Sequence, residues 1–235
     1  MTEDLPPGFQ VEEGIAWGSR AEGMLEIKFH MPKKLNTITG LGQRKLGNLV
    51  EAAQNDPNVK VIFVHGGTNY TAGNDLSAFI TNADKSKEEI HDIMTYNTQF
   101  IMTKMLTTLK NSIKPIVALV RGHCVGIGYT LTAHFDFVYC APNAKFSAPF
   151  MASAQSPEGG STYLFPQIFG TRKANEILLL DQKINAQEAV QYGFANGIIE
   201  GLDNSEWPDL NKIPTLGKLL ATDYKTLVNA KSLLN

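Results

Sequence analysis

The chain has 235 residues, of which 43% are hydrophobic and 19% are charged, and these proportions are typical of a globular protein with one main core. A formal net charge of −2 gives no electrostatic basis for binding nucleic acid, and the apolar runs are too short to span a bilayer. We therefore expect neither a nucleic-acid partner nor a membrane partner. The two cysteines, Cys124 and Cys140, fit neither a disulfide framework nor a CxxC metal pair, which favours a reducing compartment.

The first predicted elements are a strand, a helix and a second strand. Apolar residues alternate with polar ones over residues 25–29, which predicts a strand with one buried face. Thr39 predicts the N-cap of a helix whose apolar face carries Leu46, Leu49, Val50 and Ala53. A proline within residues 56–58 ends this helix, and the β-branched run 59–65 predicts the second strand.

The middle and the end of the chain predict further alternation of helices and strands. A short helix is expected over residues 76–79, and the spacing of apolar residues predicts one long helix over 88–110. The continuous apolar run 116–120 predicts a strand buried on both faces. The later expected elements are a helix over 127–133, strands over 135–140 and 144–150, short helices beginning near 161, 173 and 186, a strand over 193–200 and a helical tail from 207. This alternation predicts a layered α/β or α+β fold.

A lone carboxylate, Glu158, is the main chemical signal, and it lies on the Pro/Gly-rich turn over residues 156–160. Taken alone, a glutamate in a loop is more often a solvated surface group. Here several aromatic residues can surround it with apolar surface: Phe146, Phe150, Tyr163, Phe165 and Phe169. Such surroundings raise a carboxyl pKa towards the range that suits a general base.

Two upstream turns, over residues 70–75 and 122–128, each follow a strand that is predicted to be buried. In the first turn, N–H groups at the start of a helix would point outward and favour negative charge. In the second, Gly126 and Gly128 remove side-chain obstruction and allow close backbone approach to a ligand. The alternative for the first turn is an ordinary strand-to-helix turn in which Asp75 caps a helix. The second turn lacks the third glycine of a dinucleotide-binding loop. Together, the three turns can remove a proton beside a carbonyl group and hold the resulting oxyanion.

Several other chemistries lack their motifs in this sequence. There is no GxSxG nucleophile elbow and no GxxxxGK[ST] phosphate loop. The histidines show neither HxxxH nor HExxH spacing, so we expect no metal site. His134 and Asp136 are interpreted as residues of the fold rather than as a catalytic dyad.

Six segments of the chain resemble the enoyl-CoA hydratase/isomerase (crotonase) superfamily in their order and spacing, and the likeness runs from about residue 17 to about residue 200. The segments are Pro32-Lys33-Lys34-Leu35-Asn36, Thr71-Ala72-Gly73-Asn74-Asp75-Leu76, Val120-Arg121-Gly122, Cys124-Val125-Gly126-Ile127, Asp136-Phe137-Val138-Tyr139 and Gln155-Ser156-Pro157-Glu158-Gly159. Within the superfamily, the Gly-Asn-Asp and Ser-Pro-Glu-Gly segments look most like those of the peroxisomal-type Δ3,Δ2-enoyl-CoA isomerases.

The resemblance implies a crotonase-like spiral of repeated ββα units over residues 1–200, followed by a shortened helical segment over 201–235. It implies an oxyanion hole made by the backbone N–H groups of Asn74 and Ile127. It also implies that Glu158 is the base, which moves a proton from C2 to C4 of a 3-enoyl-CoA in the β-oxidation of unsaturated fatty acids.

Hydratases of the superfamily use two glutamates, which fall here on Thr130 and Phe150. Neither residue is acidic, and this favours an isomerase over a hydratase. Two alternatives stay open. One is another acyl-CoA reaction of the superfamily, such as dienoyl-CoA isomerisation, hydration or thioester hydrolysis, and the other is a non-catalytic acyl-CoA-binding homologue.

The resemblance further implies an acyl-CoA substrate, so that CoA is part of the substrate and no separate cofactor is expected. The positions matched to substrate or CoA binding are Lys33, Lys34, Ala72, Gly73, Asp75, Leu76, Gly126 and Phe150. We expect a homotrimer or a dimer of trimers. The expected compartment is the peroxisome or the mitochondrion, with the cytoplasm as the alternative, since residues 232–235 are not a Ser-Lys-Leu signal.

Overall fold

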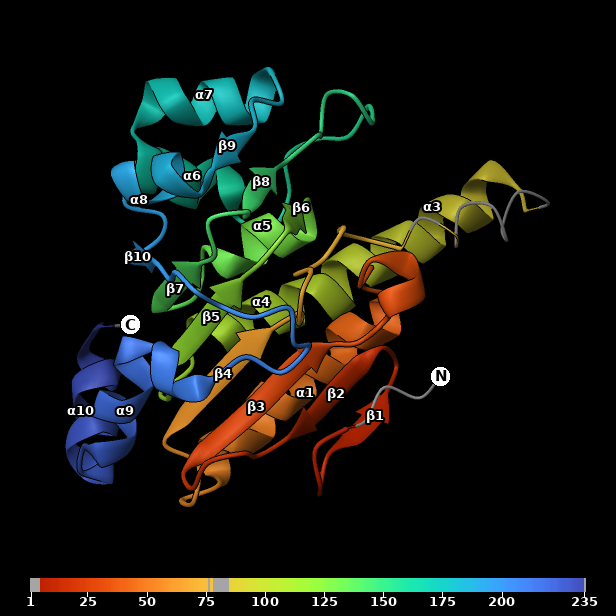
Figure 1. Ribbon diagram of the computed structural model, residues 1–235. Coiled ribbons are helices and arrows are strands. Elements are labelled where there is room, and N and C mark those ends of the chain that lie inside the picture. Colours follow the sequence, from red (N-terminus) through yellow and green to blue (C-terminus); the bar gives the residue numbers. More distant parts are fainter. Residues whose placement is uncertain (1–4, 76, 78–84, 235) are drawn as a thin grey trace.

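The computed structural model describes residues 5–75, 77 and 85–234. Its centre is a seven-stranded sheet with the order β1-β2-β3-β4-β5-β7-β10 (Figure 1). The strands are β1 (Gln10–Glu12), β2 (Ile15–Gly18), β3 (Met24–Phe29), β4 (Val61–His65), β5 (Ile116–Val120), β7 (Phe137–Cys140) and β10 (Gly197–Ile198). β1, β2 and β3 pair antiparallel, and every pair from β3 to β10 is parallel.

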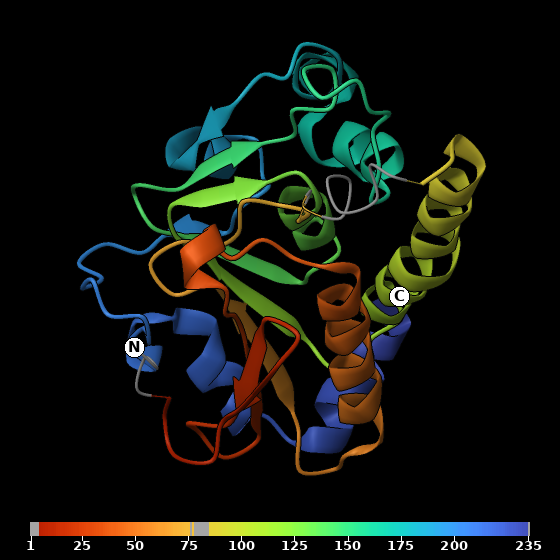
Figure 2. The same cartoon turned by 90° about the vertical axis from the view of Figure 1, so that its right-hand side faces the viewer.

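Helices cover both faces of this sheet (Figures 1 and 2). On one face, α1 (Gly40–Asn55) and α4 (Thr103–Lys110) pack with Ile62 and Val64 of β4 in the larger apolar cluster. On the other face, α9 (Pro214–Ala221) packs with Val61 and Phe63 in a second cluster. In the sequence, α9 follows η3 (Leu210–Lys212) and precedes α10 (Tyr224–Leu234). Successive residues of β4 therefore enter opposite apolar layers, which explains its unbroken hydrophobic run.

The predicted helices are confirmed where capping residues mark their ends. Thr39 is the N-cap of α1, and its hydroxyl accepts a hydrogen bond from the Gly42 amide at 3.0 Å. The single helix predicted over 88–110 is interrupted: α3 (Lys87–Tyr96) and α4 are joined by the π-helical turns of η2 (Asn97–Met102). The helix expected over 76–79 falls, apart from Ser77, outside the described residues.

The prediction of one exposed face for β3 was wrong, because Glu26 and Lys28 are buried as fully as their apolar neighbours. Glu26 accepts hydrogen bonds from Arg20 at 2.6 and 2.8 Å and from His65 at 2.9 Å. Lys28 forms an ion pair with Glu206 at 2.9 Å. Charged residues can occupy such positions only when partners from distant segments compensate the lost hydration, and alternation along one strand does not reveal those partners.

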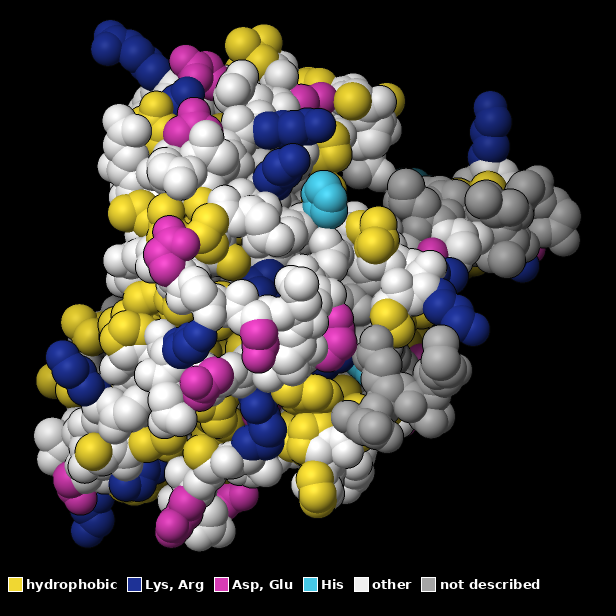
Figure 3. All heavy atoms as spheres, in the orientation of Figure 1, with side chains coloured by type: hydrophobic (Ala, Val, Ile, Leu, Met, Phe, Trp, Pro, Cys, Tyr) yellow, Lys and Arg dark blue, Asp and Glu magenta, His cyan; other side chains and the backbone are white. Residues whose placement is uncertain are grey.

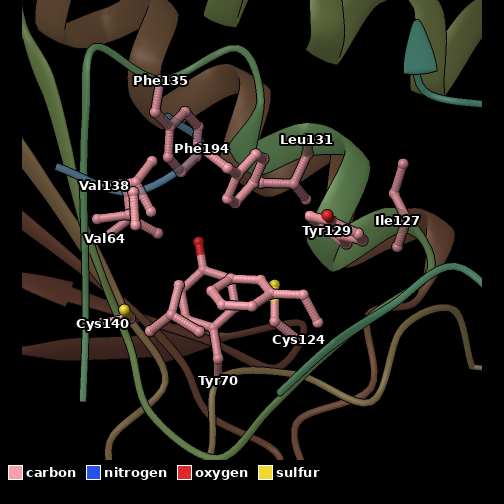
Figure 4. Close-up of a cluster of buried hydrophobic side chains, with 14 of the residues drawn as sticks. Val64, Tyr70, Cys124, Ile127, Tyr129, Leu131, Phe135, Val138, Cys140 and Phe194 are labelled. Atoms are coloured by element: carbon pink, nitrogen blue, oxygen red, sulfur yellow. The ribbon is translucent and has the colours of Figure 1, made fainter. Parts of the chain in front are cut away.

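A smaller three-stranded sheet lies beyond β5 and β7 and carries the upper helices of Figure 1. Its strands are β6 (His123–Val125), β8 (Lys145–Ser147) and β9 (Ile184–Asn185), and the helices are α5 (Ile127–Thr132), α6 (Ser161–Phe169), α7 (Thr171–Leu179) and α8 (Ala186–Gln191). Figure 4 shows Ile127, Tyr129 and Leu131 of α5 among the buried side chains that join both sheets. The ring of Tyr129 lies 4.8 Å from that of Phe165 and 4.8 Å from that of Phe194. This aromatic packing anchors α5 firmly.

Two lysines tie the last helices to the sheet. The buried Lys114 donates to the carbonyls of Asp56 and Val59 and to the Tyr224 hydroxyl at 2.7–3.0 Å. Lys60 donates to the carbonyls of Leu220 and Thr222 at 3.0 and 3.2 Å. On the face seen in Figure 3, basic and acidic side chains are interspersed. No helix within the described ranges combines the length and the apolar character that crossing a membrane requires.

Candidate active site

The two glycine-bearing turns lie side by side and run in the same direction. Thr71 and Cys124 form a parallel bridge, in which the Thr71 amide donates to the His123 carbonyl at 2.9 Å. The Val125 amide in turn donates to the Thr71 carbonyl at 3.1 Å. Asn74 and Ile127 each stand three residues beyond this bridge. The structure therefore brings together the two residues that were predicted to form the oxyanion hole.

Both predicted donors follow a glycine in the left-handed region. Gly73 has φ of 95° and Gly126 has φ of 53°, conformations that side-chain-bearing residues seldom adopt. Throughout the described ranges, the Asn74 and Ile127 amides donate no hydrogen bond to another protein group. Ile127 is also the first residue of α5, where backbone N–H groups lack partners within the helix. Two backbone donors are therefore available to an external oxygen.

Contacts with the first half of the chain hold the Asn74 turn in place. The Ile38 amide donates to the Gly73 carbonyl at 2.8 Å, and the Asp75 amide donates to the Ile38 carbonyl at 3.0 Å. Gln43 of α1 donates from Nε2 to Asn74 Oδ1 at 2.8 Å. The side chain of Asn74 thus has a structural partner, and its N–H remains free for a ligand.

Lys34 and Asp75, both predicted to contact substrate or CoA, form an ion pair at 2.8 Å. Lys34, with help from Ser77, lowers the pKa of Asp75 to about 2. Asp75 Oδ1 also accepts from the Ser77 amide at 2.9 Å, as a helix cap would, although the expected helix lies outside the described residues. Lys33 is exposed on η1 (Pro32–Lys34), beside the same turn.

Ala72 also lies at this edge, because its amide donates to the Leu35 carbonyl at 3.0 Å. Leu76, another predicted contact, falls outside the described residues. The structure thus gathers most of the predicted CoA-side positions around the Asn74 turn.

Asn36 is a positioning residue that sequence reasoning did not single out. Its side-chain amide donates to the carbonyls of Gly66 and Asn69, each at 2.7 Å, and its Oδ1 accepts from the Met31 amide at 2.9 Å. It is 5% exposed and has φ of 59°, a conformation that asparagine tolerates better than most residues. The Lys-Leu-Asn sequence was the available signal, because asparagine is typical of such turns.

Glu158 lies on the third turn, which packs against α5. The next residue, Gly159, lies against α5, where a side-chain carbon would stand 3.6 Å from Ile127 Cδ1. Burial raises the pKa of the Glu158 carboxyl to about 7. Across the part of the chain that the structure describes, its carboxylate oxygens make no hydrogen bond or ion pair. The group is therefore desolvated, unpartnered and able to exchange protons near neutral pH.

The aromatic surroundings of Glu158 differ in part from those predicted. Phe146, Phe150, Phe165 and Phe169 are buried, but they belong to the central apolar cluster. Tyr163 is 68% exposed, so the prediction that it encloses the carboxylate was wrong. Phe150, also predicted to touch substrate, is only 3% exposed.

The two positions that match the hydratase glutamates hold buried residues, Thr130 and Phe150, that pack in the interior. Thr130 is fully buried, and a side-chain carbon on Gly159 would overlap its hydroxyl. Phe150 lies in the apolar core. Within the described residues, no group of three or more His, Cys, Asp or Glu side chains could hold a metal ion. The chemistry available here is proton transfer by one carboxylate beside two backbone donors.

Known proteins are similar to this chain over most of its length. The family model described as enoyl-CoA hydratase/isomerase matches residues 19–203. The mouse protein "Enoyl-CoA delta isomerase 3, peroxisomal" is 35% identical over 177 residues, which is 75% of this chain and 54% of the relative. The rat "Enoyl-CoA delta isomerase 2" is 35% identical over 189 residues, which is 80% of this chain and 47% of the relative. The chain thus spans about half the length of these curated relatives.

A solved structure supports the fold. The crystal structure of an enoyl-CoA hydratase from Polaromonas sp. JS666 superposes with a TM-score of 0.82, covering 94% of this chain and 82% of the other, at 22% identity. The likeness at this identity concerns the fold alone, whereas the family match covers most of the sequence. The chain therefore belongs to the enoyl-CoA hydratase/isomerase family.

Proposed function

We propose that this chain is a Δ3,Δ2-enoyl-CoA isomerase, which converts a 3-enoyl-CoA to the conjugated 2-trans-enoyl-CoA. The main support is that the chain combines one desolvated carboxylate, on Glu158, with two backbone N–H groups, on Asn74 and Ile127, that bind no other protein group within the described residues. A hydrogen on C2 of a 3-enoyl thioester is acidified by both the carbonyl group and the double bond. It is therefore within reach of a carboxylate base near neutral pH.

In the proposed reaction, the thioester oxygen accepts hydrogen bonds from the Asn74 and Ile127 amides. Glu158 removes a proton from C2, and the negative charge of the dienolate develops on that oxygen. Each preorganised donor contributes about 3 kcal/mol to stabilising such a charge. Glu158 then returns the proton at C4, because C2 and C4 lie on the same side of the bound dienolate. The carboxylate is regenerated, and no separate cofactor takes part.

Hydration is the less favoured reaction, because it needs a second acid or base to position water. Thr130 and Phe150 occupy those two positions, and both are packed into the interior. Incubation with crotonyl-CoA should leave its conjugated absorbance unchanged. A hydration rate comparable to the isomerisation rate would contradict the single-carboxylate mechanism.

The direct test follows the ultraviolet absorbance of enoyl-thioester conjugation with 3-hexenoyl-CoA as substrate. We expect absorbance to rise in a Glu158-dependent manner. Dienoyl-CoA isomerisation and thioester hydrolysis are tested with their own substrates in parallel. If acyl-CoA binds but no substrate turns over, the chain is a binding homologue instead.

The biological setting is proposed on the same basis. One similar relative carries the word peroxisomal in its name, which makes that compartment our proposal, with the mitochondrion and the cytoplasm as alternatives. A homotrimer or a dimer of trimers is the proposed assembly. Light scattering tests the assembly, and imaging of the tagged full-length protein tests the compartment.

A further inference from the structure

The backbone that carries Glu158 is held by two side chains, although its carboxylate is not. The Glu158 carbonyl accepts a hydrogen bond from the Ser161 hydroxyl at 2.7 Å and from the Ser161 amide at 3.1 Å. The next carbonyl, that of Gly159, accepts from His134 Nε2 at 2.8 Å. Ser161 is the first residue of α6 and directly follows the turn, whereas His134 reaches the turn from a distant part of the sequence.

Thr130 lies within α5, His134 lies two residues beyond its C-terminal end, and the glycine turn packs against both. A side-chain carbon on Gly159 would overlap the Thr130 hydroxyl, and one on Gly160 would stand 3.2 Å from His134 Nε2. The two glycines have φ of 68° and 76°, so they also supply the left-handed backbone that the turn requires. The backbone of the turn therefore packs directly against the side chains of Thr130 and His134.

We propose that His134 is a positioning residue, which sets the location of Glu158 relative to the oxyanion hole by binding the Gly159 carbonyl. This inference rests on the proposed role of Glu158 as the base. The opposite end of α5 supplies the Ile127 amide, and the helix between them is fixed by Tyr129 and Leu131 in the apolar cluster (Figure 4). The short helix and the turn that follows it thus contact both halves of the site.

The hydrogen bond between His134 and the Gly159 carbonyl defines the histidine tautomer. A carbonyl oxygen only accepts, so Nε2 must carry the hydrogen. Burial lowers the pKa of His134, the bond to Gly159 opposes this, and the charge of Lys110 lowers it further. The ring is therefore neutral at the pH where Glu158 works. An amide side chain of similar reach can replace this donor, but a phenyl ring cannot.

The test compares His134→Phe, which keeps a ring without a donor, with His134→Gln, which keeps an N–H donor. We expect the Phe variant to lose kcat by about 10- to 100-fold, since small misplacements of a reacting group have effects of this size. KM should stay within about twofold, because ground-state binding is retained. The Gln variant should recover most of kcat. Gln54→Met is the matched control: it removes hydrogen bonds to Val50, Ser112 and Ile113, away from the turn, and should leave kcat unchanged.

A second readout does not depend on turnover. The carboxyl pKa of Glu158, followed by carbon NMR in protein labelled at glutamate, should fall by about one unit in the Phe variant as the loosened turn admits water. Equal kcat and equal Glu158 pKa in the Phe variant and the wild type would overturn the proposal, as would a Gln variant no better than Phe. If the Phe variant does not fold, His134→Leu replaces it, and failure of both to fold would make His134 a residue of the fold only. Inactivity of the wild-type protein refutes the proposed function instead, and the NMR titration still decides the role of His134.

Discussion

Gly73 lies directly against Val125: a side-chain carbon on Gly73 would stand 2.9 Å from the Val125 carbonyl oxygen. At this contact the two turns that carry Asn74 and Ile127 meet with no room for a side chain. Any side chain at residue 73 would have to separate them. The spacing of the two proposed oxyanion donors thus depends on the absence of a single methyl group.

Gly73→Ala should lower kcat by about 100-fold, because it both pushes the turns apart and strains a residue with φ of 95°. The assay is isomerisation of 3-hexenoyl-CoA by folded protein, checked by circular dichroism. Gly193→Ala is the control, since Gly193 has φ of 78° but no atom within 4 Å of the added carbon. Equal losses in both variants would show that backbone strain, and not the separation of the turns, causes the effect.

Glu158→Gln should abolish isomerisation and leave the fold and acyl-CoA binding intact. The amide has nearly the same shape, but it cannot accept a proton, and loss of a general base typically reduces the rate by about 10²–10⁴-fold. Turnover and equilibrium binding of a non-reactive acyl-CoA are measured on the same preparation. Retention of more than about a tenth of the wild-type rate would assign the base elsewhere.

The pH dependence of kcat/KM should follow the ionisation of Glu158. Burial raises its pKa to about 7, and only the ionised form can take a proton from C2. The rate should therefore fall about tenfold per pH unit below this value and level off above it. A rate that stays flat down to pH 5 would mean that the working base has an ordinary carboxyl pKa.

The raised pKa of Glu158 also predicts that the stability of the folded state falls as pH rises, whereas the reaction rate increases. Because the folded carboxyl has a raised pKa, the folded state binds more protons than the unfolded state between pH 4.5 and about 7, and wild-type stability falls as pH rises through this window. Glu158→Gln removes the penalty, so the variant should be more stable at pH 8 by at most about 3 kcal/mol. Urea unfolding at pH 8 and at pH 4 measures this. The difference should vanish at the lower pH.

The sequence predicted those parts of the site that depend on local backbone chemistry. Proline and glycine around Glu158, and glycine before Asn74 and before Ile127, mark turns whose conformations follow from the residues themselves. The strand β5 could also be predicted from the sequence, because a continuous run of apolar residues is typical of a strand that is buried on both faces.

Contacts between distant segments could not be predicted in this way. The bond from His134 to Gly159 joins residues 25 positions apart, and the bond from Gln43 to Asn74 joins residues 31 apart. The burial of Glu26 depends likewise on Arg20 and His65, which pair with it only in the folded sheet. The local pattern of residues in the sequence does not reveal such partners.

The Asn74 turn offers a test that separates side chain from backbone. Asn74→Ala keeps the N–H and loses only the bond with Gln43, which leaves a buried amide donor unpaired and should reduce stability by about 1 kcal/mol. Gln43→Met loses the same bond from the other side and is the matched control. Both variants should retain most of kcat.

Asn74→Pro deletes the N–H itself. That N–H binds no other group within the described chain, so the substitution breaks no backbone hydrogen bond, and it loses the same side-chain bond with Gln43 that Asn74→Ala loses. Folding can be checked by circular dichroism. The folded variant should lose about 100-fold or more in kcat, as expected for one missing oxyanion donor. Near-normal kcat would place the thioester oxygen elsewhere. An Ala variant as inactive as the Pro variant would instead make the Asn74 side chain the functional group, and its bond with Gln43 would then belong to the catalytic site.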